Sequence, residues 1–497
     1  MGVKHDDVVV IGYGPTGMTT AALLGRAGHR VTVLERYAGL YNLPRAASFD
    51  DETMRTFARL GIAPRLLPTL HAQPTYEWRN ANGDLLIEHA YADEGRSGWA
   101  EWYMMYQPDL EDALDEVCRE TPGVDVRLGS AVTGIEQTPD GVVLTTADGS
   151  RFAASYVVAC DGGNSFTREA LGIGQDDYGF AEPWLVCDFR LHEDAEALGL
   201  PRALQLGDPR QPTSIISLGE RHHRFSFMLD AGESVEDAPA VWTRVADRLT
   251  PDDADLIRVA TYTFRSLVAH RWRSGRVLLA GDAAHQMPPF LGQGMCSGVR
   301  DAQNLAFKLD LVLRGAAGDA ILDTYQSERE PHVRAVIEKG VELGRAQTIR
   351  DPELAAERDR RLLAERAAAA RPANLRLPGL GPGFVGPGGG ELSVQGRVDD
   401  GARVDRLDQV VGGGFHFLVT EEALSELDQQ ALAVAGVRVV AFGEQPGGPV
   451  VVDVDGTYRR WFDELGATAV AVRPDLYVFG AGTDPKGLAL ALLDGFV

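Results

Sequence analysis

Two stretches of the chain place a single carboxylate beside closely spaced glycines, a pattern suited to holding a sugar and phosphates. In the first stretch Gly12, Gly14 and Gly17 follow a short apolar run with G-x-G-x-x-G spacing, and Glu35 ends the next apolar run. Glycines in a strand-to-helix turn let phosphates approach backbone N–H groups, and an acid roughly 20 residues further on can bind ribose hydroxyls. We therefore expect dinucleotide binding here; a tight turn in an unrelated α/β domain is the alternative.

The second stretch, residues 276–308, has the order strand, acid, stiff turn, glycine loop and helix. Its apolar run 277–280 has the length of a buried strand, and Asp282 follows it. The glycines at 292–294 leave backbone N–H groups accessible, and the start of the following helix adds a partial positive charge. This geometry suits a ligand with sugar hydroxyls at one end and an electron-rich ring system at the other. An ordinary strand–loop–helix unit with a helix cap is the alternative.

The elements that must position these turns change character along the chain. Around both turns short buried strands alternate with helices, which predicts an α/β unit. Between about 179 and 271 long strands of alternating polarity predict an antiparallel sheet. These strands are expected at 184–191, 213–219, 224–229 and 257–264, with a helix near 240–248.

The C-terminal third is expected to contain two long helices, a linker and a small α/β unit. The helices are placed at 322–346 and 351–370, and the Pro/Gly-rich linker at 371–390. In the last hundred residues, strands are expected at 415–419, 437–442, 467–472 and 477–479, with helices at 421–435 and 484–493.

Composition limits the class of protein. With 497 residues the chain is too long for one core, so two or three domains are expected. A formal net charge of -24 argues against nucleic acid and anionic membranes as partners, because both require clustered Lys and Arg. The four cysteines form no C-x-x-C pair or metal-ligand spacing, and no charge-free apolar run could span a bilayer. We therefore expect a cytoplasmic protein without a bound metal.

Three motifs resemble those of a known family. The sequence GDAAHQMPPFLGQGM, residues 281–295, resembles the second FAD motif of the class A flavin-dependent aromatic hydroxylases. Residues 161–168 match the family's D-G-x-x-S-x-x-R motif, and the pattern Q-P-x-L-E-x-x-L begins at Gln107. Together with the N-terminal glycine turn, these motifs look most like the phenol hydroxylase branch, in particular the 3-(3-hydroxyphenyl)propionate hydroxylases. The hydroxylases of aromatic polyketides are related.

This resemblance implies a cofactor, a donor and a reaction. FAD would be reduced by NADH or NADPH, oxygen would add to the flavin C4a, and the resulting hydroperoxide would hydroxylate a phenol ring carbon. The implied partner is a small aromatic substrate, and a monomer or homodimer is expected. Three alternatives remain. The first is a Baeyer–Villiger or epoxidising enzyme that acts on an aromatic polyketide, and the second is a non-enzymatic flavin-binding protein. The third is a flavin-dependent halogenase of related fold, although the W-x-W-x-I-P signature of many halogenases is absent.

The resemblance also implies a fold with four parts. The expected fold is α/β, with a Rossmann-like FAD-binding domain, an antiparallel β-sheet substrate domain and a C-terminal thioredoxin-like domain. The FAD-binding domain is placed at 1–72, 104–180 and 272–330, the substrate domain at 73–103 and 181–271, the helical brace and Pro/Gly linker at 331–394, and the thioredoxin-like domain at 395–497. Because that last domain contains no cysteine, we expect it to have no redox role.

Candidate site residues are carried over from the matched motifs. The expected cofactor-binding residues are Gly12, Gly14, Pro15, Thr16, Gly17, Glu35, Arg36, Arg45, Gln107, Val132, Asp161, Gly162, Arg168, Gly281, Asp282, Pro289, Gly292, Gln293, Gly294 and Met295. Asp161 has the alternative of being a simple helix cap.

Catalysis and substrate binding call for a positive group beside the flavin, a base or hydrogen-bond relay for the phenol, and aromatic walls. The candidates for catalysis are Arg45, His285, Tyr262 and Tyr103, each of which has a purely structural alternative. The candidates for the substrate pocket are Trp99, Trp102, Phe225, Phe227, Pro288 and Phe290. Phe225 and Phe227 share one face of a strand, and alternation alone does not decide whether that face is core or pocket.

Overall fold

The nucleotide-binding sheet is built from the most apolar short runs of the chain. In this computed structural model, which describes residues 5–230, 232–233, 237–368 and 377–496, five parallel strands form its centre. In spatial order they are β18 (Val277–Leu279), β11 (Arg151–Ala159), β1 (His5–Ile11), β2 (Val31–Leu34) and β8 (Val124–Arg127). Strand β17 (Arg273–Ser274) pairs with β18, and the hairpin β9 (Val132–Thr138) and β10 (Gly141–Thr146) joins through β11. The predicted sheet is confirmed.

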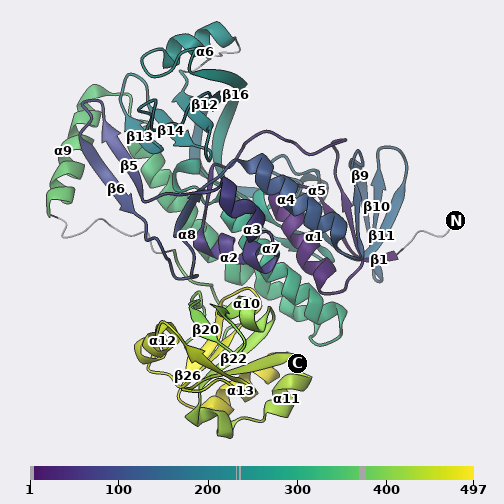
Figure 1. Cartoon of the computed structure of the whole chain (residues 1–497). Helices are drawn as coiled ribbons and strands as arrows, with labels where there is room; N and C mark the ends of the chain where they lie inside the picture. The colour runs from purple at the N-terminus through teal and green to yellow at the C-terminus, as the bar shows by residue number, and fades with distance from the viewer. Residues whose placement is uncertain (1–4, 231, 234–236, 369–376, 497) are drawn as a thin grey trace.

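Helices cover this sheet because its central strands are apolar on both faces. The main helices around it are α1 (Pro15–Arg26), α4 (Gln107–Glu120) and α7 (Gly294–Leu313), with the short α5 (Phe166–Ala170) after β11 (Figure 1). Parallel strands end at one edge of the sheet, so both glycine turns and the D-G motif meet there.

The second large sheet forms a separate layer above the first, with its two longest strands side by side. It has eight strands in the order β19 (His285–Gln286), β16 (Ala254–Ala269), β12 (Gln175–Leu191), β15 (His222–Met228), β14 (Thr213–Ser217), β13 (Ala203–Gly207), β5 (Thr75–Asn80) and β6 (Leu85–Ala90). All neighbours are antiparallel except β13 and β5, which pair in parallel. The predicted antiparallel sheet is confirmed, and β13 is a strand that the sequence analysis did not anticipate.

Smaller elements connect the two sheets. A three-stranded sheet has the order β3 (Ser48–Asp50), β7 (Trp102–Met104) and β4 (His71–Ala72). Between β3 and β4 the chain forms the helices α2 (Asp51–Arg59) and α3 (Ala63–Leu66). Helix α6 (Ala238–Val245) packs on the outer face of the second sheet. The predicted long helices are α8 (Thr324–Gln347), which runs along the molecule, and α9 (Pro352–Ala368), which lies against β6 (Figure 1).

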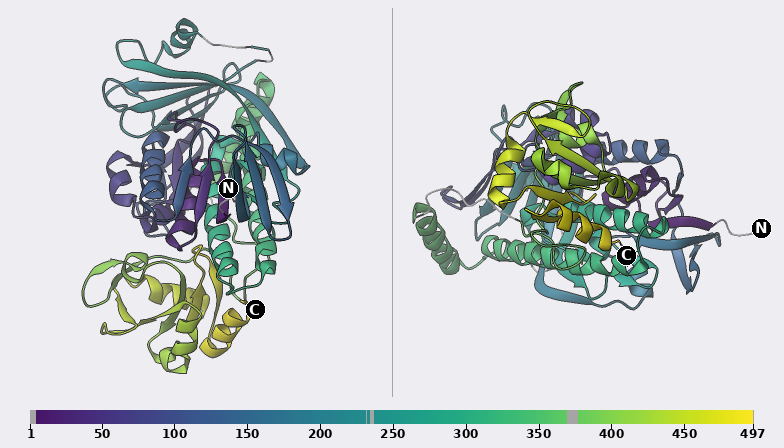
Figure 2. Two further views of the ribbon diagram at one scale, coloured as in Figure 1. Left: turned by 90° about the vertical axis from the view of Figure 1, so that its right-hand side faces the viewer. Right: turned by 90° about the horizontal axis from the view of Figure 1, so that it is seen from below.

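The C-terminal unit lies on the side of the molecule opposite the second sheet (Figure 2). Its seven strands have the order β21 (Val404–Arg406), β20 (Arg397–Asp399), β24 (Val450–Asp453), β23 (Val437–Phe442), β22 (Phe415–Thr420), β25 (Ala469–Val472) and β26 (Val478–Gly482). Its helices are α10 (Leu407–Val411), α11 (Gln429–Val434), α12 (Thr457–Leu465) and α13 (Pro485–Asp494). The helix expected at 421–435 is shorter, because Asp428 caps α11 by accepting a hydrogen bond from the Ala431 N–H. The thioredoxin-like relation stays a prediction.

Buried ion pairs attach the C-terminal unit to the rest of the chain. Arg55 of α2 binds Asp408 of α10 at 2.7 Å, and Arg473 binds Glu328 of α8 at 2.7 Å, with all four side chains almost fully buried. Residues 377–390 of the predicted linker contain no helix or strand, while 371–376 lie outside the described residues.

Candidate active site

A cavity of about 1090 Å³ separates the strand ends of the first sheet from the inner face of the second. Its lining includes the predicted residues Gly12, Gly14, Pro15, Thr16, Glu35, Arg36, Arg45, Gln107, Val132, Asp161, Gly162, Arg168, Asp282, Pro289, Gly292, Gly294, Met295, Trp102, Phe290 and Tyr262. Residues from three separate motifs therefore face one space, which exceeds the volume of most single-ligand pockets.

The N-terminal glycines leave room for a ligand where the backbone turns. Gly12 has φ +99°, and a Cβ there would lie 2.3 Å from the carbonyl oxygen of Cys160. A Cβ at Gly17 would lie 2.1 Å from the carbonyl oxygen of Gly12, whereas one at Gly14 would meet open space. Gly12 and Gly17 thus permit the tight turn, while Gly14 opens the start of α1 to the cavity. The first turn of α1 contains no acid, so its partial positive charge is available to phosphate.

Glu35 is held at the end of β2 by backbone donors. One carboxylate oxygen accepts a hydrogen bond from the Tyr13 N–H at 2.8 Å, and the other accepts one from the Tyr37 N–H at 2.9 Å. Each oxygen keeps further lone pairs for sugar hydroxyls. The placement fits the ribose-binding role that was predicted for it.

The D-G motif has a structural task as well as a place in the cavity wall. Asp161 accepts hydrogen bonds from the Ser165 hydroxyl at 2.5 Å and the Thr167 N–H at 2.9 Å, so it supports the start of α5, whose N-cap is Ser165. Arg168 donates to the carbonyl oxygens of Gly163 at 2.9 Å and Ala283 at 3.2 Å. Arg168 therefore ties this motif to the turn that carries Asp282.

Asp282 lines the cavity, and the turn that carries it is held by hydrogen bonds on the side away from the cavity. Although Asp282 is exposed to the cavity, desolvation by the surrounding protein raises the pKa of its carboxyl group. The turn is fixed because Asp301 accepts hydrogen bonds from the Gly281 N–H at 3.0 Å and lies 2.7 Å from His285 Nε2. His285 is 1% exposed, packs against Trp272 and does not line the cavity. The structure thus contradicts its prediction as the base that activates the substrate.

Gln107 positions the loop that carries Arg45. Its side-chain oxygen accepts hydrogen bonds from the backbone N–H groups of Arg45 at 3.1 Å and Ala46 at 2.6 Å. The Arg45 guanidinium lies over the Tyr41 ring, 4.2 Å from its centroid, and both side chains line the cavity.

A buried charge cluster, which we call the Asp188 clamp, holds the same loop from the second sheet and was missed by the sequence analysis. The clamp consists of Asp188 on β12, Arg224 on β15 and Arg258 on β16. Asp188 binds Arg224 at 2.6 Å and Arg258 at 3.5 Å. Both arginines donate to the carbonyl oxygen of Pro44, and Arg224 also donates to that of Arg45 at 2.5 Å. The only sequence signal was charge on the inward face of alternating strands.

Beside the clamp, a row of neutral polar side chains crosses the second sheet. Strand pairing aligns Ser226 with Ser214 and Ser214 with Gln205, and all three line the cavity. Gln205 donates to the Ser214 hydroxyl at 3.0 Å and to the Tyr76 hydroxyl. The side-chain oxygen of Gln205, which is 2% exposed, has no hydrogen-bond partner among the described residues. We call Tyr76, Gln205, Ser214 and Ser226 the polar row.

Strand alternation corrects the prediction for Phe225 and Phe227. Because Ser226 faces the cavity, its two neighbours face outward, where they pack in a separate core with Val241 and Val245 of α6. Trp184 and Phe290, which are 6.1 Å apart between ring centroids, form part of the aromatic wall instead.

Four other predicted residues lie behind the cavity wall. Trp99 lies under the Arg406 guanidinium, 3.6 Å from the ring centroid, and so contacts the C-terminal unit. Tyr103 packs against Phe49 and accepts a hydrogen bond from the Ala100 N–H. Gln293 binds Asp50 and Arg300 and does not line this cavity.

Pro288 also lies behind the wall, where it is buried beside Gly340 of α8. Gly17 and Gly281 contribute backbone geometry rather than cavity surface.

These features match those that FAD requires. The glycine turn and α1 suit the pyrophosphate, Glu35 suits the ribose, Asp282 suits the ribityl hydroxyls, and the start of α7 suits the pyrimidine edge of the flavin. Residues 5–340 match the family of FAD binding domains, and residues 390–491 match the HcaD C-terminal domain.

The chain belongs to the FAD binding domain family.

Relatives of this flavoprotein are hydroxylases. It is 48% identical to a probable NADH-specific resorcinol 4-hydroxylase of Rhodococcus jostii (strain RHA1), over 98% of this chain and 94% of that protein. It is 35% identical to a 3-(3-hydroxy-phenyl)propionate/3-hydroxycinnamic acid hydroxylase of Mycobacterium sp. (strain JLS), over 96% and 89% of the two chains.

Solved flavin-dependent monooxygenases share its fold. The flavin-dependent monooxygenase PieE, solved with FAD and substrate, superposes with a TM-score of 0.84 at 24% identity over 99% of both chains. Aklavinone-11 hydroxylase, solved with FAD and aklavinone, gives 0.77 at 25% identity over 100% of both. The protein is an FAD-dependent aromatic hydroxylase that consumes a nicotinamide donor and molecular oxygen, so its predicted reaction class is confirmed. In the part of the chain that the structure describes, no helix has the length and apolar character needed to cross a bilayer.

Proposed function

We propose that this enzyme hydroxylates a neutral single-ring phenol of the resorcinol type with NADH as the electron donor. The observation that carries the proposal is the polar row, which presents uncharged hydrogen-bonding groups beside the aromatic wall. In the proposed complex the unpartnered side-chain oxygen of Gln205 would accept a hydrogen bond from a phenol hydroxyl, and the hydroxyls of Ser214 and Ser226 would bind a second hydroxyl on the ring. The relative that is named as an NADH-specific resorcinol 4-hydroxylase supports the same substrate and donor.

The charges beside the polar row argue against a substrate with a carboxylate. Arg224 and Arg258 are the cations in the neighbouring row of the sheet, and both are already bound to Asp188 and to backbone carbonyls. A propionate side chain would have to replace these partners to form an ion pair with Arg224 or Arg258. Losing a buried ionic partner costs about 3–5 kcal/mol, so a neutral ring is the better fit.

Bound FAD supplies the oxygen chemistry, and the chain's own residues orient the ring and keep the site dry. Trp102, Trp184 and Phe290 provide apolar surface that excludes water from the reacting ring carbon. Burial raises the pKa of Tyr76, so its hydroxyl stays protonated at neutral pH and keeps its hydrogen bond with Gln205. Tyr262, which lines the cavity with the Arg258 guanidinium 5.1 Å from its ring centroid, remains our candidate for contact with the substrate hydroxyl.

The test compares substrates and variants of the FAD-loaded enzyme. We expect resorcinol to accelerate oxidation of NADH without accumulation of peroxide, and 3-(3-hydroxyphenyl)propionate to be a much weaker substrate. Gln205→Leu should raise the KM for resorcinol. Gln347→Leu is the matched control, because Gln347 is equally buried with an unpartnered side-chain oxygen but lies outside the cavity.

Equal use of the propionate, or equal KM values in the two variants, would contradict the proposal. We further propose that the enzyme acts in the cytoplasm as a monomer or homodimer. Light scattering of the holoenzyme measures the assembly state.

A further inference from the structure

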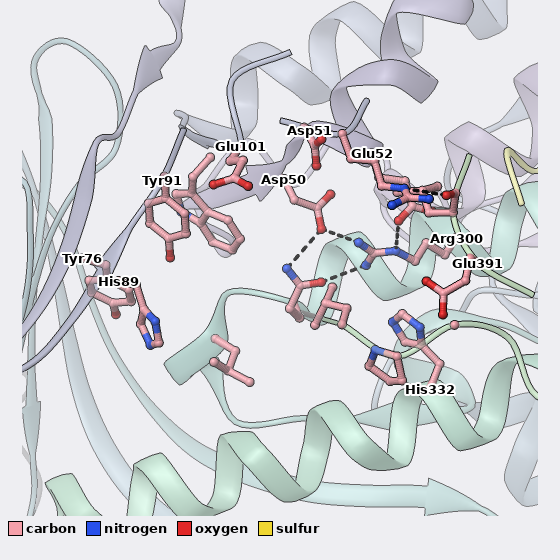
Figure 3. A pocket seen from close by; sticks show the side chains of 18 of the residues that line it. Asp50, Asp51, Glu52, Tyr76, His89, Tyr91, Glu101, Arg300, His332 and Glu391 are labelled. Atoms are coloured by element: carbon pink, nitrogen blue, oxygen red, sulfur yellow. Dashed lines mark hydrogen bonds and ion pairs between the residues drawn. The ribbon is translucent and has the colours of Figure 1, made fainter. Parts of the chain in front are cut away.

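A second, smaller cavity lies directly behind the wall of the substrate cavity. Its volume is about 190 Å³, and Tyr76, Trp102 and Phe290 line both cavities. At its other end the lining residues Ala90 and Pro378 are exposed on the molecular surface. Its lining residues therefore extend from the surface to the partition beside the aromatic wall. We call this cavity the side chamber, and Figure 3 shows part of its lining.

Two side chains that line the side chamber carry buried polar atoms without partners in the part of the chain that the structure describes. The Oε1 atom of Glu52 has no hydrogen bond among the described residues, although Oε2 of the same carboxylate binds Arg300 at 2.7 Å. The indole N–H of Trp78 also has no partner there. Glu52 is 3% exposed and Trp78 is 4% exposed, and both line the chamber. Leaving such groups unpaired costs about 1–3 kcal/mol each, so a ligand that bonds to them recovers free energy.

The size and walls of the side chamber select a single aromatic ring. An apolar cavity of about 150 Å³ holds benzene, so the side chamber has room for a ring with hydroxyl substituents. Tyr91 and Trp102 stack with ring centroids 5.3 Å apart, and Trp102 supplies the partition. A phenol hydroxyl is both donor and acceptor, which matches an unpaired carboxylate oxygen and an unpaired indole N–H.

Charge in the side chamber excludes anions. Its lining contains five acidic side chains, Asp50, Asp51, Glu52, Glu101 and Glu391, against the two guanidinium groups of Arg96 and Arg300. Figure 3 shows Arg300 already bound between Asp50 and Glu52. A phenolate or a carboxylate-bearing phenol would meet net negative charge, whereas a neutral phenol would not.

We propose that the side chamber is a second binding site for a neutral single-ring phenol, through which substrate passes to the flavin cavity, with Trp102 as the movable partition. This inference rests on the proposed function, because it assumes a neutral phenol as substrate. The Trp102 ring also packs closely against the glycine loop at 292–294, because a Cβ at Gly292 would lie 2.6 Å from it.

The experiment blocks the mouth of the side chamber without touching the flavin cavity. Ala90→Trp fills the rim, and Ala81→Trp is the matched control, because Ala81 is exposed in the turn of the same hairpin but lies outside both cavities. Resorcinol is titrated into oxidised, FAD-loaded enzyme without NADH, and binding rates are followed by stopped-flow absorbance of the flavin. We expect the association and dissociation rates at the flavin site to fall together by about tenfold in Ala90→Trp and to match wild type in Ala81→Trp. Calorimetry should show a second equivalent of resorcinol in wild type that Ala90→Trp loses.

A reversible block keeps the result independent of folding. Ala90→Cys labelled with a benzyl thiosulfonate should bind resorcinol slowly, and reduction of the label should restore the wild-type rate in the same sample, while wild type treated identically should not change. A single equivalent of resorcinol in wild type, or equal rates in all variants, overturns the proposed chamber. Failure of wild type to hydroxylate resorcinol instead overturns the proposed function, so the two failures are distinguishable.

Discussion

Replacing Asp188 by Asn tests whether the Asp188 clamp fixes the flavin-side loop. Asp188 is fully buried, accepts hydrogen bonds from Arg224 at 2.6 and 3.1 Å, and contacts Arg258 at 3.5 Å. Asn keeps the shape and one acceptor oxygen but removes the charge that compensates two buried guanidinium groups. The arginines in turn hold the carbonyl oxygens of Pro44 and Arg45, so the loop should become less ordered.

The size of the effect follows from the contacts. Removing one partner of a buried ion pair costs about 3–5 kcal/mol, and the retained acceptor recovers one hydrogen bond of about 1 kcal/mol, so we expect a loss of about 2–4 kcal/mol in the free energy of unfolding. If about 1.4 kcal/mol of this appears as poorer order of the loop that carries Pro44 and Arg45 in the cavity wall, we expect FAD to bind about tenfold more weakly.

Urea unfolding measures the stability, and titration of the apoprotein with FAD, followed by flavin fluorescence, measures the affinity. Asp177→Asn is the matched control, because Asp177 lies on the same strand but is exposed. We also expect Asp188→Asn to release more peroxide per NADH consumed, since a mobile loop admits water. The reasoning fails if Asp188→Asn and Asp177→Asn differ by less than about 0.5 kcal/mol and bind FAD equally well.

Three further changes test other parts of the structure. Gly298→Ala should destabilise the protein by about 1–3 kcal/mol and weaken FAD binding, because the new Cβ would lie 2.2 Å from Thr16 Oγ1; unfolding and FAD titration check this, and unchanged values would refute the close contact of α1 and α7. Burial and the charge of Asp50 raise the pKa of Asp51 to about 7 from an ordinary 3.8, so the folded protein binds this proton more tightly than the unfolded chain does. The free energy of unfolding should therefore fall as pH rises from about 4 to 7. Urea unfolding at pH 5 and pH 8 should show a smaller fall for Asp51→Asn than for wild type. Arg473→Met leaves carboxylates uncompensated at the C-terminal junction and should cost about 3–5 kcal/mol by urea unfolding, whereas a loss below 1 kcal/mol would show that the ion pair with Glu328 is dispensable.

The cofactor half of the site was predictable because its chemistry is local in the sequence. Glycine spacing and an acid after an apolar run located Gly12, Glu35 and Asp282 within strand-to-helix turns. The same local reasoning assigned His285 to the substrate. The sequence does not show that Asp301, 16 residues later in α7, holds the His285 side chain behind the cavity wall.

The substrate half depends on strand register, which the sequence does not encode locally. Asp188, Arg224 and Arg258 come together only because three strands pair in one alignment. Alternation placed Phe225 and Phe227 on a common face, but the packing of α6 decides that this face is core. Gln205 was missed because β13 has only five residues, Ala203–Gly207, too few to show a clear alternation.

The parallel pairing of β5 with β13 has a consequence for synthesis of the enzyme on the ribosome. Glu77 aligns with Leu204, so the hairpin that carries Tyr76 emerges long before its neighbour. At typical elongation rates of about 5–20 residues per second, the edge of β5 waits roughly 6–25 seconds for that partner. During this interval an unpaired strand edge with aromatic side chains is accessible to other nascent chains, and a chaperone that covers it would raise the yield of active flavoprotein.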